Sequence, residues 1–482
     1  MSARSRRLGK NGTERILSAD ECQAIAQRVF GFARGGGETR LFISSWWNGE
    51  LRWARNRVSL ASDRRDVDVL VKRFADAATG EARTNQLDDV SLEAAVRAAE
   101  REGGVFDKWS PSKPAGVPPL PGIDSRQPTV RSDATYNLGT EARGELVRAL
   151  IEPAEAKQML SAGYLELHAA ARARLSSLRP SGPYTPWDEA YVAWTQARCS
   201  LTVRDATGTA SGWAGLSSYD WNRIDARALA ARALEKCVAS QHPVALEPGR
   251  YTVILEPQAV ADLMETLMDS LQRGFPDTPW DQGVDDALHI RRYKLGLKVV
   301  DARVTIDHDP MDPRLGILNE PGLDMGPVAW IDHGVLTNLG YSRDDGVPSI
   351  GANLGMRPGA NDIGHGISYR MSGGQVSQDE MIRTTRRGLL VTRLWDVEPL
   401  DGRTALSQGL TRDGLWLIEN GKITRAVRNF RFTESPLFVL NNLEQLGEPV
   451  PVFRPSWNDL TPAVVPPLKA HDFSFTSLID AI

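Results

Sequence analysis

Helical and alternating patterns follow one another along the first hundred residues. Apolar residues recur at helical spacing from Cys22 to Phe30, and they follow an S-x-x-E capping box formed by Ser18 and Glu21. This pattern predicts a helix over residues 18–34. We expect two further helices, over residues 66–77 and 91–102.

Two segments with alternating apolar and polar positions lie after the first of these helices. The segments LFISSWW and ELRWARNRV flank Asn48-Gly49, a dipeptide that accommodates the two positive φ angles of a type I′ turn. We therefore predict a β-hairpin with its turn at Asn48-Gly49.

An antiparallel meander is predicted after a proline-rich loop. Six prolines between Pro111 and Pro128 exclude a regular helix or central strand, so we expect a loop over residues 110–130. A helix over residues 140–160 is followed by two alternating segments, GYLELHAAARARL and EAYVAWTQARCSLTVRD. Asp205–Gly208 forms a turn into a third, TASGWAG, and a helix is expected over residues 222–240.

The pattern changes after His242-Pro243. Tyr251–Leu255 is predicted to be a strand that passes through Glu256-Pro257 into an amphipathic helix. Downstream we predict mainly antiparallel strands, with hairpin turns at Asp332-His333-Gly334 and Asn420-Gly421.

Two helices interrupt these later strands. The first is short and begins at a capping box of Ser377 and Glu380, and the second is predicted over residues 436–446. Residues after about 448 are rich in proline and are expected to form an arm over the surface.

These elements predict an α+β protein with two domains. Residues 1–243 are expected to form an N-terminal α/β domain with an antiparallel sheet and flanking helices. Residues 244–450 are expected to form a C-terminal domain that is mainly antiparallel β with a few helices, and residues 451–482 the arm.

Composition excludes several classes of function. The chain has 57 Lys and Arg against 61 Asp and Glu, a net charge of -4, so it lacks the basic field that dominates nucleic-acid or anionic-membrane binding. No apolar run approaches the length of a membrane span. The three cysteines form no CxxC pair, which favours a cytoplasmic protein without disulfides or a thiolate metal site.

The histidines argue against a zinc-binding helix. The chain has seven, none precedes a glutamate, and no two lie within five residues of each other. The HExxH arrangement, in which two imidazoles hold the ion and the carboxylate activates water, is therefore absent. From the residues alone we predict no catalytic residue and no metal ligand of this kind.

One polar cluster leaves a second interpretation open. Asp307-His308-Asp309 and Asp312, together with Asp332-His333, supply carboxylates and imidazoles that suit a non-standard metal site. The same residue types also form turns at strand ends, and His333-Gly334 is typical of a hairpin tip, which is the interpretation we favour.

Other reactive or aromatic residues are expected to be structural. No G-x-S-x-G elbow occurs, and Cys199 and Cys237 lie in patterns typical of inert packing. The glycines Gly35–Gly37 follow a helix instead of preceding one, so they do not form a phosphate site. We expect packing or strand positions, and no ligand role, for Trp46, Trp47, Trp53 and His168.

Seven segments carry a resemblance to a known family. In order they are RWARNRV, LTVRDATGTASGWAG, LEPGRYTVILEPQAVADLM, VTIDHDPMDP, IDHGVLTNL, GGQVSQDEMI and GLWLIENGKITRAVRNFRF. Their order over residues 20–450 resembles that of the TldD/PmbA family, whose members are known as metallopeptidases and as modulators of DNA gyrase.

The resemblance also points to one branch of that family. In the TldD branch the helix after the strand carries HExxxH, and a cysteine of the C-terminal domain completes a metal site. This chain has Glu256, Pro257 and Ala261 at the matching positions, so it resembles the PmbA (TldE) branch, which lacks the metal motif. The resemblance implies no cofactor in this chain, with zinc only in a TldD-like partner.

The function implied by the resemblance is that of a TldE-like subunit in a cytosolic TldD/TldE-type metallopeptidase complex that degrades or processes unfolded peptides. Its partner would be a TldD-like subunit with HExxxH, and a homodimer stays open. Two alternatives remain: a non-enzymatic binding or modulatory protein, and a stand-alone hydrolase with a metal site near Asp307, His308, Asp309 and His333.

Overall fold

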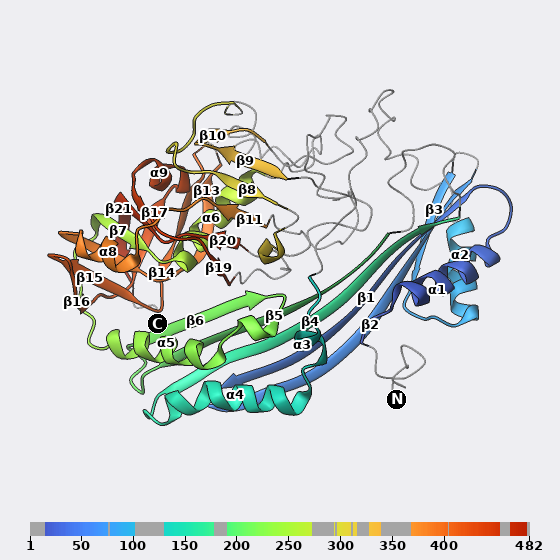
Figure 1. Ribbon diagram of the computed structural model, residues 1–482, viewed down its shortest axis with the longest axis horizontal. Coiled ribbons are helices and arrows are strands. Elements are labelled where there is room, and N and C mark those ends of the chain that lie inside the picture. The colour runs from blue at the N-terminus through green and yellow to red at the C-terminus, as the bar shows by residue number, and fades with distance from the viewer. Residues whose placement is uncertain are drawn as a thin grey trace.

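The computed structural model describes residues 15–75, 78–101, 130–177, 190–271, 294, 296–309, 312–315, 327–338, 368–402, 404–453 and 463–479. In these ranges the chain forms three sheets, one in the N-terminal half and two in the C-terminal half (Figure 1). The α+β fold class and the sheet-rich C-terminal part are confirmed, and the boundaries at residues 243 and 450 stay predictions. None of the helices in these ranges is long and apolar enough to cross a membrane.

The N-terminal half contains a six-stranded antiparallel sheet in the order β3-β2-β1-β4-β5-β6. The strands are β1 (Glu38–Ala54), β2 (Arg57–Ala75), β3 (Ala78–Thr84), β4 (Leu160–Ser176), β5 (Ala190–Arg204) and β6 (Ser211–Ser218). The predicted meander is confirmed in β4, β5 and β6. Asp205 holds the turn before β6, because its side chain accepts a hydrogen bond from the backbone N–H of Ala210.

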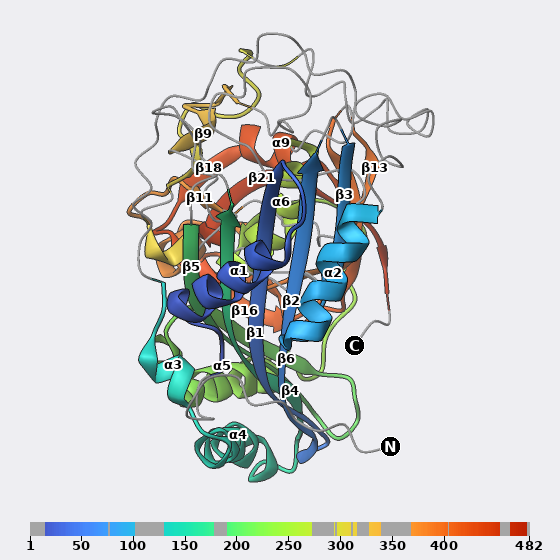
Figure 2. The same ribbon diagram turned by 90° about the vertical axis from the view of Figure 1, so that its right-hand side faces the viewer.

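Helices cover one face of this sheet. They are α1 (Ala19–Phe32), α2 (Asp89–Arg101), α3 (Asp133–Asn137), α4 (Thr140–Glu155) and α5 (Ala226–Ala239), with a 3-10 turn at Trp221–Arg223. Alternate β1 residues such as Leu41, Trp47 and Leu51 are buried against them, and Figure 2 shows α1 and α2 in front of β1 and β2. The capping box of Ser18 and Glu21 is present at the start of α1.

The opposite face of the sheet, called the open face below, carries the remaining alternate side chains. Cross-strand partners on this face include Asn48 with His168 and His168 with Gln196. The C-terminal half lies over one end of the open face, while α4 and α5 lie on the other side of the sheet (Figure 1). The open face is therefore largely polar and is turned toward the C-terminal half.

The predicted hairpin turn at Asn48-Gly49 is wrong. β1 continues through both residues in register with β2, and the chain turns at Arg55-Asn56, whose φ angles are 51° and 62°. A Cβ at Gly49 would overlap the guanidinium of Arg143, which packs across the sheet there. Gly49 therefore gives room to a neighbouring side chain and takes no part in a turn.

The helix predicted over residues 66–77 is also wrong, because β2 occupies most of that range. Val67, Val69 and Val71 are buried at alternate positions, which is the period of a strand. The helix expected over residues 91–102 is present as α2. Residues 110–129 of the predicted proline-rich loop lie outside the described residues.

The C-terminal half contains a nine-stranded sheet in the order β13-β14-β17-β21-β7-β12-β15-β16, with β18 paired to β21. The strands are β7 (Gly249–Leu255), β12 (Arg387–Val391), β13 (Leu394–Asp401), β14 (Leu406–Thr411), β15 (Leu415–Glu419), β16 (Lys422–Ala426), β17 (Phe430–Glu434), β18 (Leu443–Leu446) and β21 (Leu468–Leu478). The predicted turn at Asn420-Gly421 joins β15 to β16, with both φ angles positive.

A smaller six-stranded sheet has the order β10-β9-β8-β11-β20-β19. Its strands are β8 (Ile306–His308), β9 (Val328–Asp332), β10 (Val335–Leu336), β11 (Tyr369–Met371), β19 (Val450–Val452) and β20 (Ala463–Val465), and a 3-10 turn lies at Pro313–Leu315. The predicted hairpin turn at Asp332-His333-Gly334 is confirmed between β9 and β10.

Helix α6 (Pro257–Leu271) shares one core with both C-terminal sheets. Leu263 and Leu267 pack in a cluster with Leu389 of the larger sheet and Trp330 of the smaller one. The shorter helices are α8 (Gln378–Arg383) and α9 (Pro436–Asn441). Ser377 caps α8 as predicted, because its side chain accepts a hydrogen bond from the backbone N–H of Glu380.

The C-terminal arm expected over the surface is not what the structure shows. Residues 463–465 form β20, and β21 lies inside the larger sheet between β17 and β7. Phe473 and Phe475 of β21 are buried in the main core. The prolines end at Pro467, so the segment after them can donate its backbone N–H groups to a sheet. The helix predicted over residues 436–446 is shorter than expected, because α9 ends at Asn441 and β18 follows.

Candidate functional site

The junction between β7 and α6 brings the two halves of the chain into contact. Glu256, between the strand and the helix, is buried, and its carboxylate accepts hydrogen bonds from Lys236 Nζ at 2.7 Å and Arg232 Nη2 at 3.2 Å. Both cations lie on α5 of the N-terminal half. Burial lowers the pKa of Lys236, and the adjacent Glu256 carboxylate opposes that shift.

A chain of hydrogen bonds continues from the first turns of α6. Gln258 Nε2 donates to Asp262 Oδ1 at 2.8 Å and to the carbonyl oxygen of Phe453 at 2.6 Å, while the N–H of Phe453 donates to Gln258 Oε1 at 3.2 Å. The second oxygen of Asp262 accepts from the N–H of Leu394 at 2.9 Å. Burial raises the pKa of Asp262 to about 7, against the smaller opposite influence of Arg393.

The aromatic ring of Phe453 extends this chain to the open face of the N-terminal sheet. Its centroid lies 6.0 Å from that of Tyr164 on β4 and 5.9 Å from that of Trp213 on β6. The guanidinium carbon of Arg198 lies 5.2 Å from the Phe453 centroid. Phe453 is therefore held by α6 through its backbone and by the N-terminal sheet through its ring.

Arginine and tryptophan side chains alternate beside this contact. The guanidinium carbon of Arg393 lies 4.5 Å from the ring centroid of Trp213 and 4.6 Å from that of Trp395. The guanidinium carbon of Arg412 lies 4.8 Å from the same Trp395 centroid. Asp413 is buried and forms an ion pair with Arg393 at 3.2 Å. The stack joins β6 of the N-terminal half to β13 and to the turn after β14.

The junction does not fit the zinc ion that the family resemblance implies for its catalytic branch. The carboxylate of Glu256 is engaged by two cations, and Ala261 has no donor atom and is buried in the core. Across the ranges that the structure describes, no group of three His, Cys, Asp or Glu side chains is placed to hold a metal ion. We derive no metal-dependent step at this junction.

The alternative metal site does not assemble among the described residues. Arg370 binds both oxygens of Asp307 at 2.9 Å, and Arg314 binds Asp312 at 2.7 Å. His308 is buried with its Nδ1 3.1 Å from the hydroxyl of Ser368, and burial lowers its pKa to about 4.

His333 lies apart from His308. It occupies the exposed tip of the β9–β10 hairpin, where its Nδ1 is 2.7 Å from Asp332 Oδ1 and its backbone N–H donates to the hydroxyl of Thr305. Asp307 and Asp312 are thus engaged in ion pairs with arginines, and His333 forms part of a hairpin turn. Asp309 directly follows the end of β8.

The cysteines are packed as the sequence predicts. Cys22, Cys199 and Cys237 are buried and free of disulfides, and burial raises the pKa of each thiol to about 12. A thiol with such a pKa is protonated at neutral pH and is a poor nucleophile. Trp47 and Trp53 are core residues, and Trp46 lies on the open face.

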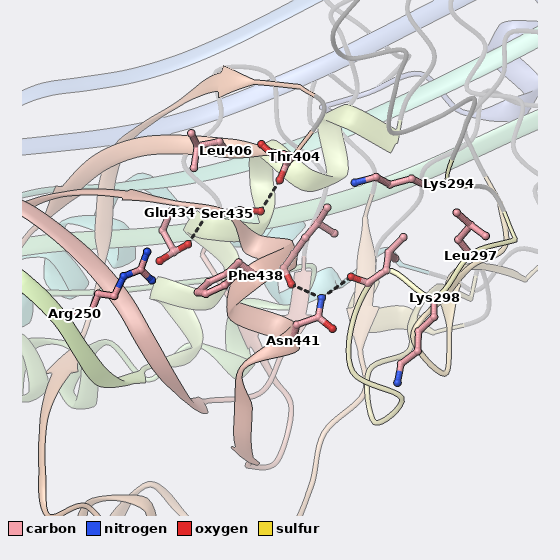
Figure 3. Close-up of a pocket in the computed structure, with 12 residues that line it drawn as sticks. Arg250, Lys294, Leu297, Lys298, Thr404, Leu406, Glu434, Ser435, Phe438 and Asn441 are labelled. Atoms are coloured by element: carbon pink, nitrogen blue, oxygen red, sulfur yellow. Dashed lines mark hydrogen bonds between the residues drawn. The ribbon is translucent and has the colours of Figure 1, made fainter.

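A separate pocket opens on the C-terminal half, with a volume of about 530 Å³. Glu434 is a buried residue that lines the pocket. Its two carboxylate oxygens accept hydrogen bonds from the backbone N–H groups of Ser435 and Ser474. Figure 3 shows Arg250 beside Glu434 and Lys294 on the other side of the pocket. None of its lining residues belongs to the junction; they are Arg250, Lys294, Leu297, Lys298, Val299, Thr404, Leu406, Glu434, Ser435, Leu437, Phe438 and Asn441.

Sequence reasoning missed most of the junction. Gln258 and Asp262 are four residues apart on one helix face, a spacing that could have linked them. Lys236, Arg393 and Phe453 come from separate elements, and only the tertiary fold brings them to α6.

The C-terminal half matches a known domain. Residues 248–477 match the model of the PmbA/TldA metallopeptidase C-terminal domain, a range that includes the junction and both C-terminal sheets. This C-terminal half is a domain of the TldD/PmbA family. No protein in a search of curated sequences matches it.

Solved structures with the same fold as this chain share little of its sequence. TldE from Thermococcus kodakarensis has a TM-score of 0.76 and 17% identity, with 95% of this chain and 100% of that chain covered. A protein named as a candidate modulator of a DNA gyrase, from Thermotoga maritima, has a TM-score of 0.73 and 18% identity, covering 94% and 100%. Another so named, from Bacteroides thetaiotaomicron, has a TM-score of 0.72 and 18% identity, covering 95% and 99%.

Proposed function

We propose that this chain is the TldE-like subunit of a cytoplasmic TldD/TldE-type metallopeptidase complex and that its own junction carries no catalytic metal. The observation that carries the proposal is the position of Glu256. Its carboxylate binds Lys236 and Arg232 where the catalytic branch of the family places a metal ligand, and Ala261 stands at the second ligand position.

The chemistry of the junction supports a structural role for it. A catalytic metal site keeps one coordination position open for water or substrate. Here Asp262 accepts a hydrogen bond on each oxygen, and Glu256 is held by two cations. Glu256 joins the two halves of the subunit and Asp262 joins α6 to β13, which leaves the proposed hydrolysis to a TldD-like partner with its own HExxxH helix.

The proposed substrate is an unfolded or extended peptide. The polar open face of the N-terminal sheet supports this, since its side chains offer hydrogen-bond donors and acceptors over several strands. In this role the chain would contribute binding surface, and the partner the reacting groups.

Co-expression with a TldD-like subunit tests the proposal. We expect a stable complex that cleaves an unfolded peptide and loses that activity on treatment with a chelator, while the isolated chain cleaves nothing. A matched control is the same complex with the HExxxH glutamate of the partner replaced by glutamine, which should assemble and remain inactive. Chelator-sensitive cleavage by the isolated chain would instead favour the stand-alone hydrolase.

A further inference from the structure

One buried polar group on the open face lacks the hydrogen-bond partner that such groups normally have. Trp194 is 7% exposed, and its indole Nε1 is buried without a hydrogen-bond partner. Gln196, two residues further along the same face of β5, is 8% exposed, and its amide makes no hydrogen bond among the described residues. Since most buried polar groups in native proteins are hydrogen-bonded, the unpaired indole N–H of Trp194 indicates a ligand, and the Gln196 amide beside it offers a second donor.

A guanidinium without a carboxylate partner lies beside them. In the register of β4 with β5, His168 is opposite Gln196 and Ala170 is opposite Trp194, so Arg172 lies on the same face one alternate position further on. The guanidinium carbon of Arg172 is 5.5 Å from the Trp194 ring, and it forms no ion pair within the described ranges. The His168 ring centroid is 6.3 Å from that of Trp194.

The carboxylates of the neighbouring row are already engaged. Glu166 pairs with Arg198 at 3.5 Å, and Glu50 pairs with Arg52. Burial, together with the smaller effects of the nearby positive charges of Arg172 and Arg198, lowers the pKa of His168 to about 4. His168 is thus neutral at physiological pH, and its Nδ1 is hydrogen-bonded to Asn48 Oδ1.

The wall behind these groups is apolar. Val130, Ala170 and Trp194 form a small hydrophobic cluster on the open face, with Val192 packed against it. A low-dielectric wall strengthens a charge-assisted hydrogen bond formed in front of it.

We propose that Arg172, Trp194 and Gln196 form a subsite that binds a carboxylate. One guanidinium with two neutral N–H donors matches a single negative charge and the acceptor-only chemistry of that group. That the carboxylate belongs to a peptide rests on the proposed function. The carboxylate has two sources there, a C-terminal α-carboxylate or the side chain of an acidic residue.

Binding to the isolated full chain tests this proposal independently of any peptidase activity. The probes are four synthetic peptides of one length with acetylated N-termini, measured by calorimetry. The first ends in a free carboxylate and the second in an amide. The third is an amidated peptide with an internal glutamate, and the fourth has glutamine at that position.

We expect binding of the first or the third peptide, or of both, at least about tenfold tighter than that of the matched amide or glutamine peptide. Tighter binding of the first peptide than of the second indicates a site for an α-carboxylate. Tighter binding of the third than of the fourth indicates a site for an acidic side chain. Equal affinities within both pairs, or no binding of any peptide, would overturn the proposal. Failure of the complex to cleave peptides would bear on the proposed function alone.

Variants locate the binding to the subsite. Arg172→Gln should abolish the preference for the carboxylate, and Trp194→Phe, which keeps the aromatic ring and removes the N–H, should weaken carboxylate binding by roughly threefold to tenfold. Arg64→Gln is the matched control, because Arg64 is an exposed arginine on the same face, opposite Asn48, and it should leave binding unchanged. If Arg172→Gln fails to fold, Trp194→Phe still decides the outcome, and an unchanged affinity in that variant contradicts the subsite.

Discussion

At the scale of single residues, burial shifts the pKa values of two titratable groups in opposite directions. Asp262 is fully enclosed between α6 and β13, so its neutral form is favoured and its pKa rises to about 7. His168 on the open face is also buried, and for an imidazole the same desolvation lowers the pKa, here to about 4. Each shift makes the stability of the fold depend on pH in a definite direction.

The stability of Asp262→Asn relative to the native chain should increase as pH rises, although asparagine offers only one of the two acceptor oxygens. The folded pKa of Asp262 lies above its ordinary value of 3.8, so the group favours folding most below about pH 4 and loses that contribution as pH rises toward 7. The melting temperature of the variant, relative to the native chain, should increase between pH 5 and pH 8. An equal difference at both pH values contradicts the assignment, and Asp396→Asn, at an exposed position, serves as control.

His168→Gln should reduce the sensitivity of the fold to acid. The folded pKa lies below the ordinary value of 6.5, so the contribution of His168 is complete above pH 6.5 and is lost as pH falls toward 4. Urea denaturation at pH 7.5 and pH 5 should show a smaller loss of unfolding free energy for the variant than for the native chain. The corresponding control is His333→Gln, because His333 is exposed at a hairpin tip.

At the scale of elements, the fold depends on close approaches that a pattern of single residues does not reveal. Arg143 of α4 crosses the sheet over Gly49 and binds Asp63 of β2. Gln258 of α6 fixes the segment of Phe453 by hydrogen bonds to both its N–H and its C=O. Both contacts join elements that are remote in sequence. We therefore expect a substitution at either contact to lower the free energy of unfolding.

Gly49→Asn should destabilise the protein by about 1–3 kcal/mol, the usual cost of forcing extra atoms into a packed site. Asparagine is well suited to a type I′ turn. If Gly49→Asn left the stability unchanged, the result would favour a hairpin turn at Asn48-Gly49 and contradict a β1 strand that continues through both residues. Gly208→Asn is the matched control, because Gly208 has a φ of 73° and open space around its Cβ position. Its effect on the urea midpoint should be small.

Gln258→Ala should lower the free energy of unfolding by roughly 2–4 kcal/mol, because it leaves the buried N–H and C=O of Phe453 without partners. Equilibrium urea denaturation measures the change. Gln241→Ala, at an exposed position after α5, should change it by less than about 0.5 kcal/mol. Equal effects of the two substitutions would mean that the Phe453 segment is held by other contacts.

The sequence predicted elements with strong local signals and failed where tertiary contacts decide. The capping box at Ser18, the N-cap at Ser377 and the turn at Asn420-Gly421 occur as expected, because their own side chains and φ angles specify them. Asn48-Gly49 has the same turn-forming dipeptide, yet it lies within a strand. A glycine is needed at position 49 because the side chain of Arg143 occupies the space where a Cβ would lie. Local patterns cannot show such a contact, since it depends on a helix almost a hundred residues away.

At the scale of the whole molecule, the two halves meet at the junction between β7 and α6. The sequence pattern predicted the junction at Glu256-Pro257, and the residues that match the PmbA/TldA metallopeptidase C-terminal domain include it. The ion pair of Glu256 with Lys236 and the stack of Arg393 with Trp213 depend on the packing of the N-terminal half onto this domain. They became visible only in the assembled fold.

The zinc content of the purified complex tests most directly whether this chain is the metal-free member of a pair. We predict one zinc ion per complex of the chain with its TldD-like partner, measured by inductively coupled plasma mass spectrometry after gel filtration. The isolated chain should contain no stoichiometric zinc. Two zinc ions per complex, or one per isolated chain, would contradict this assignment.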